Sequence, residues 1–274
     1  MNLPAKHLVR AGFSRAARSY DAAAALQRTV CERLLDVTTA VAPRTILDAG
    51  CGTGYGAQLL KAHWPKACVV AADFAPAMLE FAANGAKRAE SVQSAGNDAH
   101  GAGANACCAA DIEALPFAPA IFDLWWSSLT VQWCSPELVF AEAFRVLRPG
   151  GRLALSTLGG ETFAELRAAF AEVDGHAHTL DFGAAERLAT CAEAAGFRNV
   201  RTQRKMLALH YPDLRALLTA VKAIGANTLG PGRRRGMMGK ETWQRLQASY
   251  ERHRCAAGLP ACYDVILLTA EKCA

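Results

Sequence analysis

Leu47-Asp-Ala-Gly-Cys-Gly-Thr-Gly54 is the stretch of sequence that decides the fold of this chain. It begins in a short apolar run at 45–48, which is typical of a buried strand, and it precedes the helical pattern of 55–63. Its alternating glycines allow a tight turn and a close approach of the backbone to a ligand. Because the first strand-to-helix turn of a doubly wound sheet binds nucleotides, this stretch predicts a nucleotide site.

Strands and helices alternate on the C-terminal side of this turn. Ser135-Pro136 is typical of a helix start and Gly196 of a helix end. A capping box at 162–165 predicts a further helix. We expect strands at 68–73, 107–111, 122–127, 152–156 and 263–270, and helices at 75–89, 137–147 and 184–195. This order predicts an α/β, doubly wound, mainly parallel seven-stranded sheet with helices on both faces.

The chain is expected to form one domain, residues 1–274, with three parts. Residues 1–42 form a helical lid, and residues 43–205 form the nucleotide-binding core. Residues 206–258 form a helical cap over the ligand, inserted before the last strand, 261–270, which we expect to be antiparallel. The polar, glycine-rich segment 91–106 is interpreted as a surface loop.

Composition excludes several classes of protein. The chain has 274 residues, of which 52% are hydrophobic and 20% charged, as in globular proteins. No apolar run reaches the ~18 residues of a membrane helix. The ten cysteines lack CxxC spacing, which predicts reduced thiols and no metal site. The N-terminus is no secretory signal, so we expect a cytoplasmic protein, with an organelle transit peptide as the alternative.

Charge is distributed unevenly along the sequence. The net charge is +5, but residues 198–254 hold thirteen Lys and Arg against three Asp and Glu, a net charge of +10. This asymmetry predicts either an acidic partner for the C-terminal third or a solvated basic face. No aromatic residues are interleaved with Arg233, Arg234 and Arg235, which disfavours a nucleic-acid partner.

Acidic residues end the predicted strands beside the glycine turn. The Asp73 carboxylate can accept hydrogen bonds from both hydroxyls of a ribose. Asp111-Ile112 lies where a carboxylate can accept a hydrogen bond from the exocyclic amine of adenine. Tyr55 stands where the dinucleotide fingerprint has glycine, which disfavours a dehydrogenase. The same acids could instead cap helices or lie in solvated loops.

Together these residues resemble the class I S-adenosylmethionine (SAM)-dependent methyltransferases over residues 44–158. A narrower resemblance, to the malonyl-acyl-carrier-protein O-methyltransferases of biotin synthesis, covers nearly the whole chain. It rests on Phe13-Ser-Arg-Ala-Ala-Arg-Ser-Tyr20, Leu26-Gln27, Asp111-Ile-Glu-Ala-Leu-Pro116, Phe122-Asp-Leu, Val131-Gln-Trp-Cys134, Lys222-Ala-Ile-Gly-Ala-Asn227 and Leu259-Pro-Ala-Cys-Tyr263. The long 91–106 segment and the arginine run depart from the family pattern.

The resemblance implies methyl transfer from SAM to the free carboxylate of malonyl-acyl-carrier protein. The residues expected to bind SAM are Asp48, at its amino-acid end, with Gly50, Gly52, Gly54, Asp73, Asp111 and Ile112. A carboxylate with a pKa of about 4 is already ionised, so no general base is expected. The side-chain N–H groups of Gln27 and Trp133 can donate hydrogen bonds to this carboxylate, and Tyr20 can close over SAM. Alternatively, Trp133 and Tyr20 only pack and Gln27 lies on a helix surface.

Other functions remain open from the sequence alone. A SAM-dependent methyltransferase for another small carboxylic acid or for a quinone-type ring is the main alternative. An amino-directed nucleic-acid methyltransferase is disfavoured because Ser127-Ser-Leu-Thr130 lacks its motif, and a SAM sensor without turnover is the third class. His176 and His178 lack a carboxylate cluster for a metal. Arg233, Arg234 and Arg235 are expected to contact the acidic carrier protein, and no membrane partner is expected.

Overall fold

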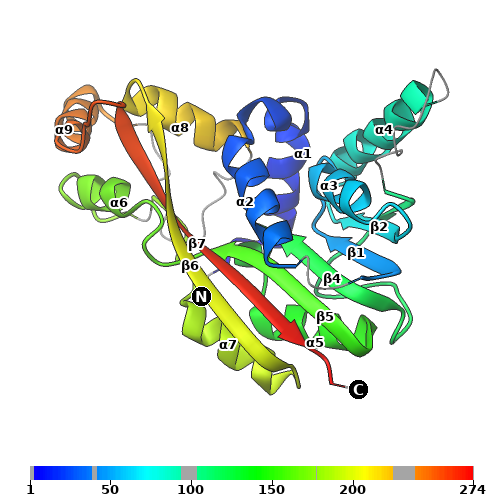
Figure 1. The fold of residues 1–274 in the computed structure, drawn as a ribbon. Coiled ribbons are helices and arrows are strands. Elements are labelled where there is room, and N and C mark those ends of the chain that lie inside the picture. The colour runs from blue at the N-terminus through cyan, green and yellow to red at the C-terminus, as the bar shows by residue number, and fades with distance from the viewer. Residues whose placement is uncertain (1–2, 39–41, 94–103, 177, 225–237, 274) are drawn as a thin grey trace.

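A computed structural model describes residues 3–38, 42–93, 104–176, 178–224 and 238–273. Its strands form one seven-stranded sheet in the order β3-β2-β1-β4-β5-β7-β6 (Figure 1). They are β1 (Thr45–Ala49), β2 (Cys68–Asp73), β3 (Ala106–Ala109), β4 (Phe122–Ser128), β5 (Leu147–Leu158), β6 (Arg198–Tyr211) and β7 (Leu259–Glu271). β1 to β5 pair in parallel, and β7 is antiparallel to β5 and β6. The expected doubly wound sheet with an antiparallel last strand is confirmed.

Helices cover both faces of this sheet (Figure 1). They are α1 (Lys6–Ala23), α2 (Ala25–Asp36), α3 (Tyr55–His63), α4 (Pro76–Gln93), α5 (Pro136–Val146), α6 (Ala164–Ala171), α7 (Ala185–Ala194), α8 (Leu214–Ala223) and α9 (Lys240–Glu251). α2 and α3 pack on one face, in a core with Trp126, and α5 and α7 pack on the other, in a core with Trp125. The consecutive tryptophans therefore point to opposite faces and pack there, as their position in one strand predicts.

The glycine turn is held tightly between β4 and α4. Gly50 and Gly54 have φ angles of +79° and +91°, which favour glycine. A Cβ at Gly50 would lie 2.3 Å from Thr130 Oγ1, and one at Gly54 would lie 2.9 Å from Ala82 Cβ. These two positions therefore need glycine for both conformation and space.

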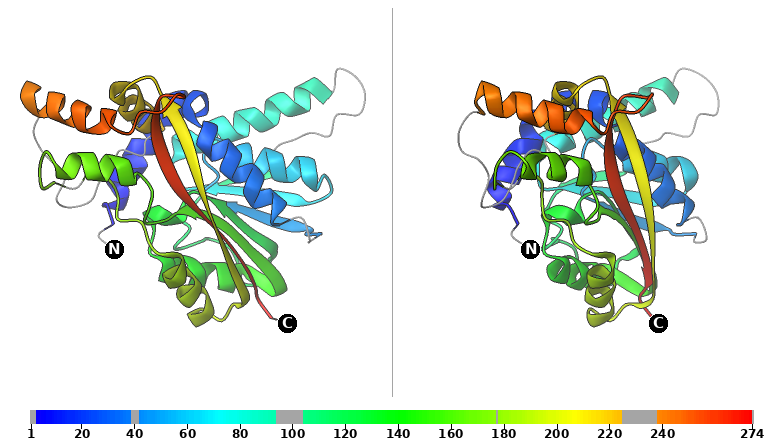
Figure 2. Two further views of the ribbon diagram at one scale, coloured as in Figure 1. Left: turned by 60° about the vertical axis from the view of Figure 1, so that its left-hand side comes forward. Right: turned by 90° about the vertical axis from the view of Figure 1, so that its left-hand side faces the viewer.

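The remaining helices gather at one end of the sheet. α6, α8 and α9 lie where β6 ends and β7 begins (Figures 1 and 2). α1 and α2 form the expected helical segment at the N-terminus. They are held to the rest of the chain partly through Ser19, whose hydroxyl donates to the carbonyl of Ala223 in α8 at 3.1 Å.

One expectation about a helix start is corrected, and the other, Ser135-Pro136 at the start of α5, is confirmed. The capping box at 162–165 does not form, because the Thr162 hydroxyl accepts from the backbone N–H of Asp264 at 3.1 Å. Phe163, with φ +58°, takes the N-cap position of α6 instead. Ser135 does precede α5 with Pro136 in its first turn, but the Ser135 hydroxyl bonds to Glu137 at 2.8 Å. Both hydroxyls therefore prefer tertiary or side-chain partners to the helix backbone.

The expected boundary at residue 206 is also corrected, because β6 continues to Tyr211. Leu207, Leu209 and Tyr211 alternate along the strand and pack against the core, whereas its Arg and Lys side chains are exposed. α4 extends to Gln93 and so enters the expected 91–106 loop, of which residues 94–103 lie outside the described residues. By contrast, Gly196 follows α7 with φ +105°, as expected.

Candidate active site

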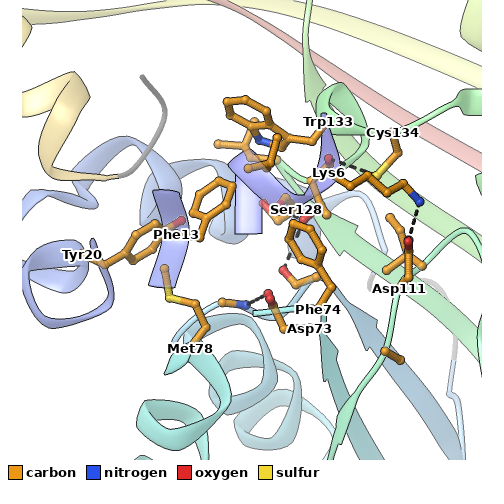
Figure 3. A pocket seen from close by; sticks show the side chains of 17 residues that line it. Lys6, Phe13, Tyr20, Asp73, Phe74, Met78, Asp111, Ser128, Trp133 and Cys134 are labelled. Carbon is orange, nitrogen blue, oxygen red and sulfur yellow. Dashed lines mark hydrogen bonds and ion pairs between the residues drawn. The ribbon is translucent and has the colours of Figure 1, made fainter. Parts of the chain in front are cut away.

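A cavity of about 660 Å³ lies beside the glycine turn (Figure 3). α1 contributes Lys6, Phe13 and Tyr20 to it, and β2 contributes Asp73. Asp111 and Ile112, just after β3, complete one side. The cavity therefore brings together the ends of neighbouring strands and the N-terminal helix. We call it the first cavity.

Asp73 joins the glycine turn to the start of α4. Its two carboxylate oxygens accept from the backbone N–H groups of Gly52 and Ala75, at 2.9 Å and 2.8 Å. Burial raises the pKa of the Asp73 carboxyl, and the two backbone bonds oppose that rise. The carboxylate is thus fixed at the cavity wall and keeps lone pairs for a ligand's hydroxyl groups.

Asp48 is buried in β1 behind the turn. Burial, and next the nearby charge of Asp73, raises its pKa to about 8, while a bond from the N–H of Ala57 opposes the rise. Within the described residues, Asp48 Oδ2 has no hydrogen-bond partner, and the same is true of Gln27 Oε1. Both residues line a third cavity, of about 460 Å³, between α2 and the turn. Two buried acceptors without partners indicate a site for a donor group such as an ammonium.

Asp111 is already engaged by the N-terminal helix. Lys6 forms ion pairs with both Asp111 and Glu113. Burial lowers the pKa of Lys6, but hydrogen bonds and charge from the two carboxylates outweigh it and raise the pKa overall. Ile112, between them, is 4% exposed and faces the first cavity. Lys6 could not be predicted as a site residue, because a lone lysine 105 residues before Asp111 gives no local signal.

Two hydrogen bonds fasten the N-terminal helices over the turn. Thr53 donates to Asp21 at 2.6 Å, and Tyr55 donates to Glu32 at 2.8 Å. Asp21 belongs to α1 and Glu32 to α2. These contacts, with the ion pairs of Lys6, hold α1 against the first cavity, which Lys6, Phe13 and Tyr20 of this helix line (Figure 3).

A second cavity, of about 980 Å³, adjoins the first. Four residues line both: Phe13, Tyr20, Leu129 and Trp133. We call these four the shared wall. The Phe13 ring meets the Trp133 ring edge-on at a centroid distance of 5.5 Å. Burial raises the pKa of Tyr20, so its phenol stays neutral and can donate a hydrogen bond.

The second cavity is lined mainly by apolar side chains, with few polar groups among them. Gln27 lies on its wall and also lines the third cavity. Gln132 is held by bonds to the Leu129 carbonyl and to Thr157. Trp133 is 6% exposed and Gln27 is partly buried, so Gln27 does not lie on an exposed helix surface. The arrangement places a ligand in the first cavity next to a ligand in the second, which suits direct group transfer.

The helical cap covers a different cavity from the one expected. Leu218 and Val221 of α8, with Ile224, line the second cavity, and no described residue of 206–258 lines the first. The first cavity is covered by α1 instead. Because β6 runs on to Tyr211, α8 begins only at Leu214, and its side chains meet the second cavity.

The two histidines have different surroundings. His178 lines the second cavity, bonds through Nε2 to Asp174 at 2.7 Å and stacks on the Phe170 ring. The His176 backbone N–H donates to the same Asp174 carboxylate at 2.9 Å. In the described part of the chain, no group of three or more His, Cys, Asp or Glu could hold a metal ion. Arg233, Arg234 and Arg235 lie outside the described residues.

All ten cysteines are free thiols. Among the described helices, none combines the length and apolarity that crossing a membrane requires.

Comparison with known proteins places this geometry in a family. The family model "Methyltransferase domain" matches residues 47–155. The chain is 44% identical to "Malonyl-[acyl-carrier protein] O-methyltransferase" of Dechloromonas aromatica (strain RCB), over 98% of this chain and 95% of the relative. It is 37% identical to "Biotin biosynthesis bifunctional protein BioHC" of Cellvibrio japonicus (strain Ueda107), over 96% of this chain and 49% of that protein.

Among solved structures, the YcgJ protein of Bacillus subtilis has a TM-score of 0.59 at 17% identity, covering 89% of this chain and 99% of that one. At this identity the likeness concerns the fold alone, and the fold is that of the class I methyltransferases. The level and extent of identity to the Dechloromonas relative go further. The chain belongs to the malonyl-[acyl-carrier protein] O-methyltransferase family.

Proposed function

We propose that this chain transfers the methyl group of SAM to the free carboxylate of malonyl-acyl-carrier protein. The product is a methyl ester, which hides a charge and so lets the malonyl group start pimeloyl synthesis for biotin. The relatives' names support this substrate and this pathway. The observation that carries the proposal is the shared wall, across which an apolar acceptor cavity meets a cavity with a glycine turn and a fixed carboxylate.

The first and third cavities suit the two ends of SAM. When bound, SAM supplies an electrophilic methyl group on a sulfonium. Asp73 would accept hydrogen bonds from the ribose hydroxyls. Asp111, beside Ile112, would accept a hydrogen bond from the adenine amine while still paired with Lys6. The buried acceptor oxygens of Asp48 and Gln27 would receive the α-ammonium group, which gives each of them a partner. Gly50, Gly52 and Gly54 let the backbone approach the ligand.

The second cavity suits a malonyl group. Its carboxylate needs no general base, because it is ionised near neutral pH. The chain's task is therefore to hold this carboxylate in line with the sulfonium, a form of positioning that can contribute up to ~7–11 kcal/mol. Trp133 and Tyr20 on the shared wall, and the amide of Gln27 beside it, would supply neutral donors that orient the carboxylate without a tight ion pair.

The basic C-terminal third suits an acidic carrier protein. β6 is an edge strand, and its cationic side chains Arg198, Arg201, Arg204 and Lys205 are all exposed. Arg204 is paired with the buried carboxylate of Asp264, which leaves the other three to face solvent. Together with Arg233, Arg234 and Arg235, they would attract an acidic body at long range and raise the association rate.

A methyl-transfer assay tests the proposal as a whole. Malonyl-carrier protein, malonyl-coenzyme A, free small acids and a quinol are offered side by side with labelled SAM. We expect methyl ester to form with the highest kcat/KM on a malonyl thioester. Methylation of only the free acids or of the quinol ring would replace the proposed substrate, and SAM binding without turnover of any acceptor would indicate a sensor.

SAM binding at pH 7 is expected to release up to about one proton. With a pKa of about 8, the Asp48 carboxyl is mostly protonated in the free protein. A bound ammonium beside it lowers that pKa, so the proton leaves on binding. Calorimetric titration in phosphate and in Tris buffer, whose ionisation enthalpies differ, measures the release. Asp48→Asn should abolish the difference between buffers, whereas equal enthalpies for the unmodified protein would contradict this placement.

Asp73→Ala is expected to weaken SAM binding by roughly 1.5–3 kcal/mol, the scale of hydrogen bonds to a charged group. Because the Asp73 carboxylate also accepts hydrogen bonds from the backbone N–H groups of Gly52 and Ala75, the variant should unfold at a lower temperature. Asp123→Ala is a matched control, since the Asp123 carboxylate also accepts two backbone N–H groups, from Arg44 and Thr45, but lies away from the cavities. The control should lose stability and keep its SAM affinity; unchanged affinity in folded Asp73→Ala would refute the ribose assignment.

Trp133→Phe is expected to keep SAM affinity and to lower kcat about 10-fold or more, because it deletes one N–H donor and keeps most of the ring. Trp125→Phe is the control, since Trp125 is fully buried in the core away from both cavities. It should leave kcat unchanged. A normal kcat for Trp133→Phe at saturating acceptor would assign Trp133 to packing alone.

Replacing Arg233, Arg234 and Arg235 together with Ala is expected to raise KM for malonyl-carrier protein. Exposed charges mainly change the rate at which the enzyme and the carrier protein encounter each other. The effect on KM should therefore shrink at high salt, where these charges are strongly screened. KM for a small malonyl thioester without the carrier should stay the same. Equal losses on both substrates would place these residues at the active site, and no loss on either would make them a solvated basic loop.

A further inference from the structure

The second cavity adjoins a surface groove that the proposed chemistry does not use. This outer groove, of about 870 Å³, is lined by parts of residues 160–182. It shares His178, Thr179, Leu180 and Phe182 with the second cavity. No described residue lines both the outer groove and the first cavity. The second cavity therefore lies between the first cavity and the groove.

The groove is open to solvent on one side and apolar on the other. Ala171, Gly175 and His176 are exposed on its rim, whereas Phe170 is 7% exposed and forms part of its floor. Residues 178–182, at the junction with the second cavity, include Leu180 and Phe182, both partly buried. An extended ligand could lie along this floor with one end in solvent and the other in the second cavity.

The groove is not basic, because its lining holds one cationic side chain and two acidic ones. Arg167 bonds to the carbonyl oxygens of Gly160 and Thr162, and the acids Asp174 and Asp181 lie in the same groove. A polyanion would meet more repulsion than attraction here. Neutral amide and alkyl groups fit this lining better.

His178 is held rigidly at the junction. Its ring stacks on Phe170 at a centroid distance of 3.6 Å, with the planes 7° apart, and its Nε2 lies 2.7 Å from Asp174 Oδ1. Because an ionised carboxylate only accepts hydrogen bonds, Nε2 must carry the proton. In the neutral ring Nδ1 is then an acceptor, the partner that an amide N–H requires.

We propose that the outer groove binds the arm of the acyl thioester, an extended chain of alkyl and amide groups, with His178 as the positioning residue where the arm enters the second cavity. The proposal rests on the proposed function, since only a thioester substrate brings such an arm. It assigns the carrier's arm to the 160–182 segment and leaves the carrier's acidic body to the basic surface. The malonyl end would then reach the shared wall from the side opposite SAM.

Steady-state kinetics with two malonyl thioesters test this assignment. Malonyl-pantetheine carries the whole arm without a protein body, whereas malonyl-N-acetylcysteamine keeps only the last amide. Gly175→Trp fills the groove without strain, because a Cβ at Gly175 has no atom within 4 Å. Ala171→Trp fills it from α6, and Ala168→Trp, exposed on the same helix but outside the groove, is the matched control.

We expect KM for malonyl-pantetheine to rise about tenfold in both groove variants, as when a binding pocket loses several methylene contacts. KM for malonyl-N-acetylcysteamine should change less than about twofold. Ala168→Trp should leave both constants unchanged, and S-adenosylhomocysteine affinity should match the unmodified protein in every variant. His178→Ala should raise KM for malonyl-pantetheine. His178→Gln, whose side-chain amide oxygen is still a hydrogen-bond acceptor, should bring KM most of the way back to the value of the unmodified protein.

Three results would overturn the proposal. The first is equal KM values for the two thioesters with the unmodified protein, because the arm would then contribute nothing. The second is groove variants that bind S-adenosylhomocysteine normally and either keep their KM for malonyl-pantetheine or lose both substrates equally. The third, no methylation of either thioester by the unmodified protein, would remove the proposed function as well and so is distinct from failure of the groove alone.

Discussion

The Asp73 carboxylate is the contact on which the site depends. By accepting the N–H groups of Gly52 and Ala75, it ties the left-handed glycine turn after β1 to the start of α4 after β2. Burial disfavours its charge, yet the two backbone bonds hold that charge in place. Its neighbour Asp48 is left with a raised pKa and, among the residues that the structure describes, an oxygen without a hydrogen-bond partner. The site thus contains buried acceptors that suit a cationic, hydroxyl-bearing ligand.

α1 adds the second constraint, because the same helix completes both cavities. Lys6 and Phe13 cover the first cavity, and Phe13 and Tyr20 form part of the wall that it shares with the second. Bonds from Thr53 and Tyr55 fasten α1 and α2 to the glycine turn and to α3. Since the acceptor carboxylate arrives ionised, what this chain must supply is alignment and exclusion of water rather than a base.

Much of this arrangement follows from local sequence, and the rest depends on contacts distant in the chain. The glycine turn, Asp73 and the antiparallel last strand were predictable because strand period, turn chemistry and position agree there. Thr162 was misread because its hydroxyl bonds to Asp264, about a hundred residues away, rather than to its own helix. No expected strand covers β6, because its exposed Arg and Lys side chains mask the alternation of Leu207, Leu209 and Tyr211. The ion pairs of Lys6 and the contact between the second cavity and the outer groove carry no local signal at all.

The central claim is that a methyl donor in the first cavity faces an acceptor in the second across the shared wall of Phe13, Tyr20, Leu129 and Trp133. The most direct measurement is a crystal structure with S-adenosylhomocysteine bound. The account predicts that the ribose hydroxyls of the ligand hydrogen-bond to Asp73 and that its amino-acid end lies beside Asp48 and Gln27. Its sulfur should lie at the shared wall and face the second cavity. A ligand in the reversed orientation, or one whose sulfur points away from the second cavity, would contradict it.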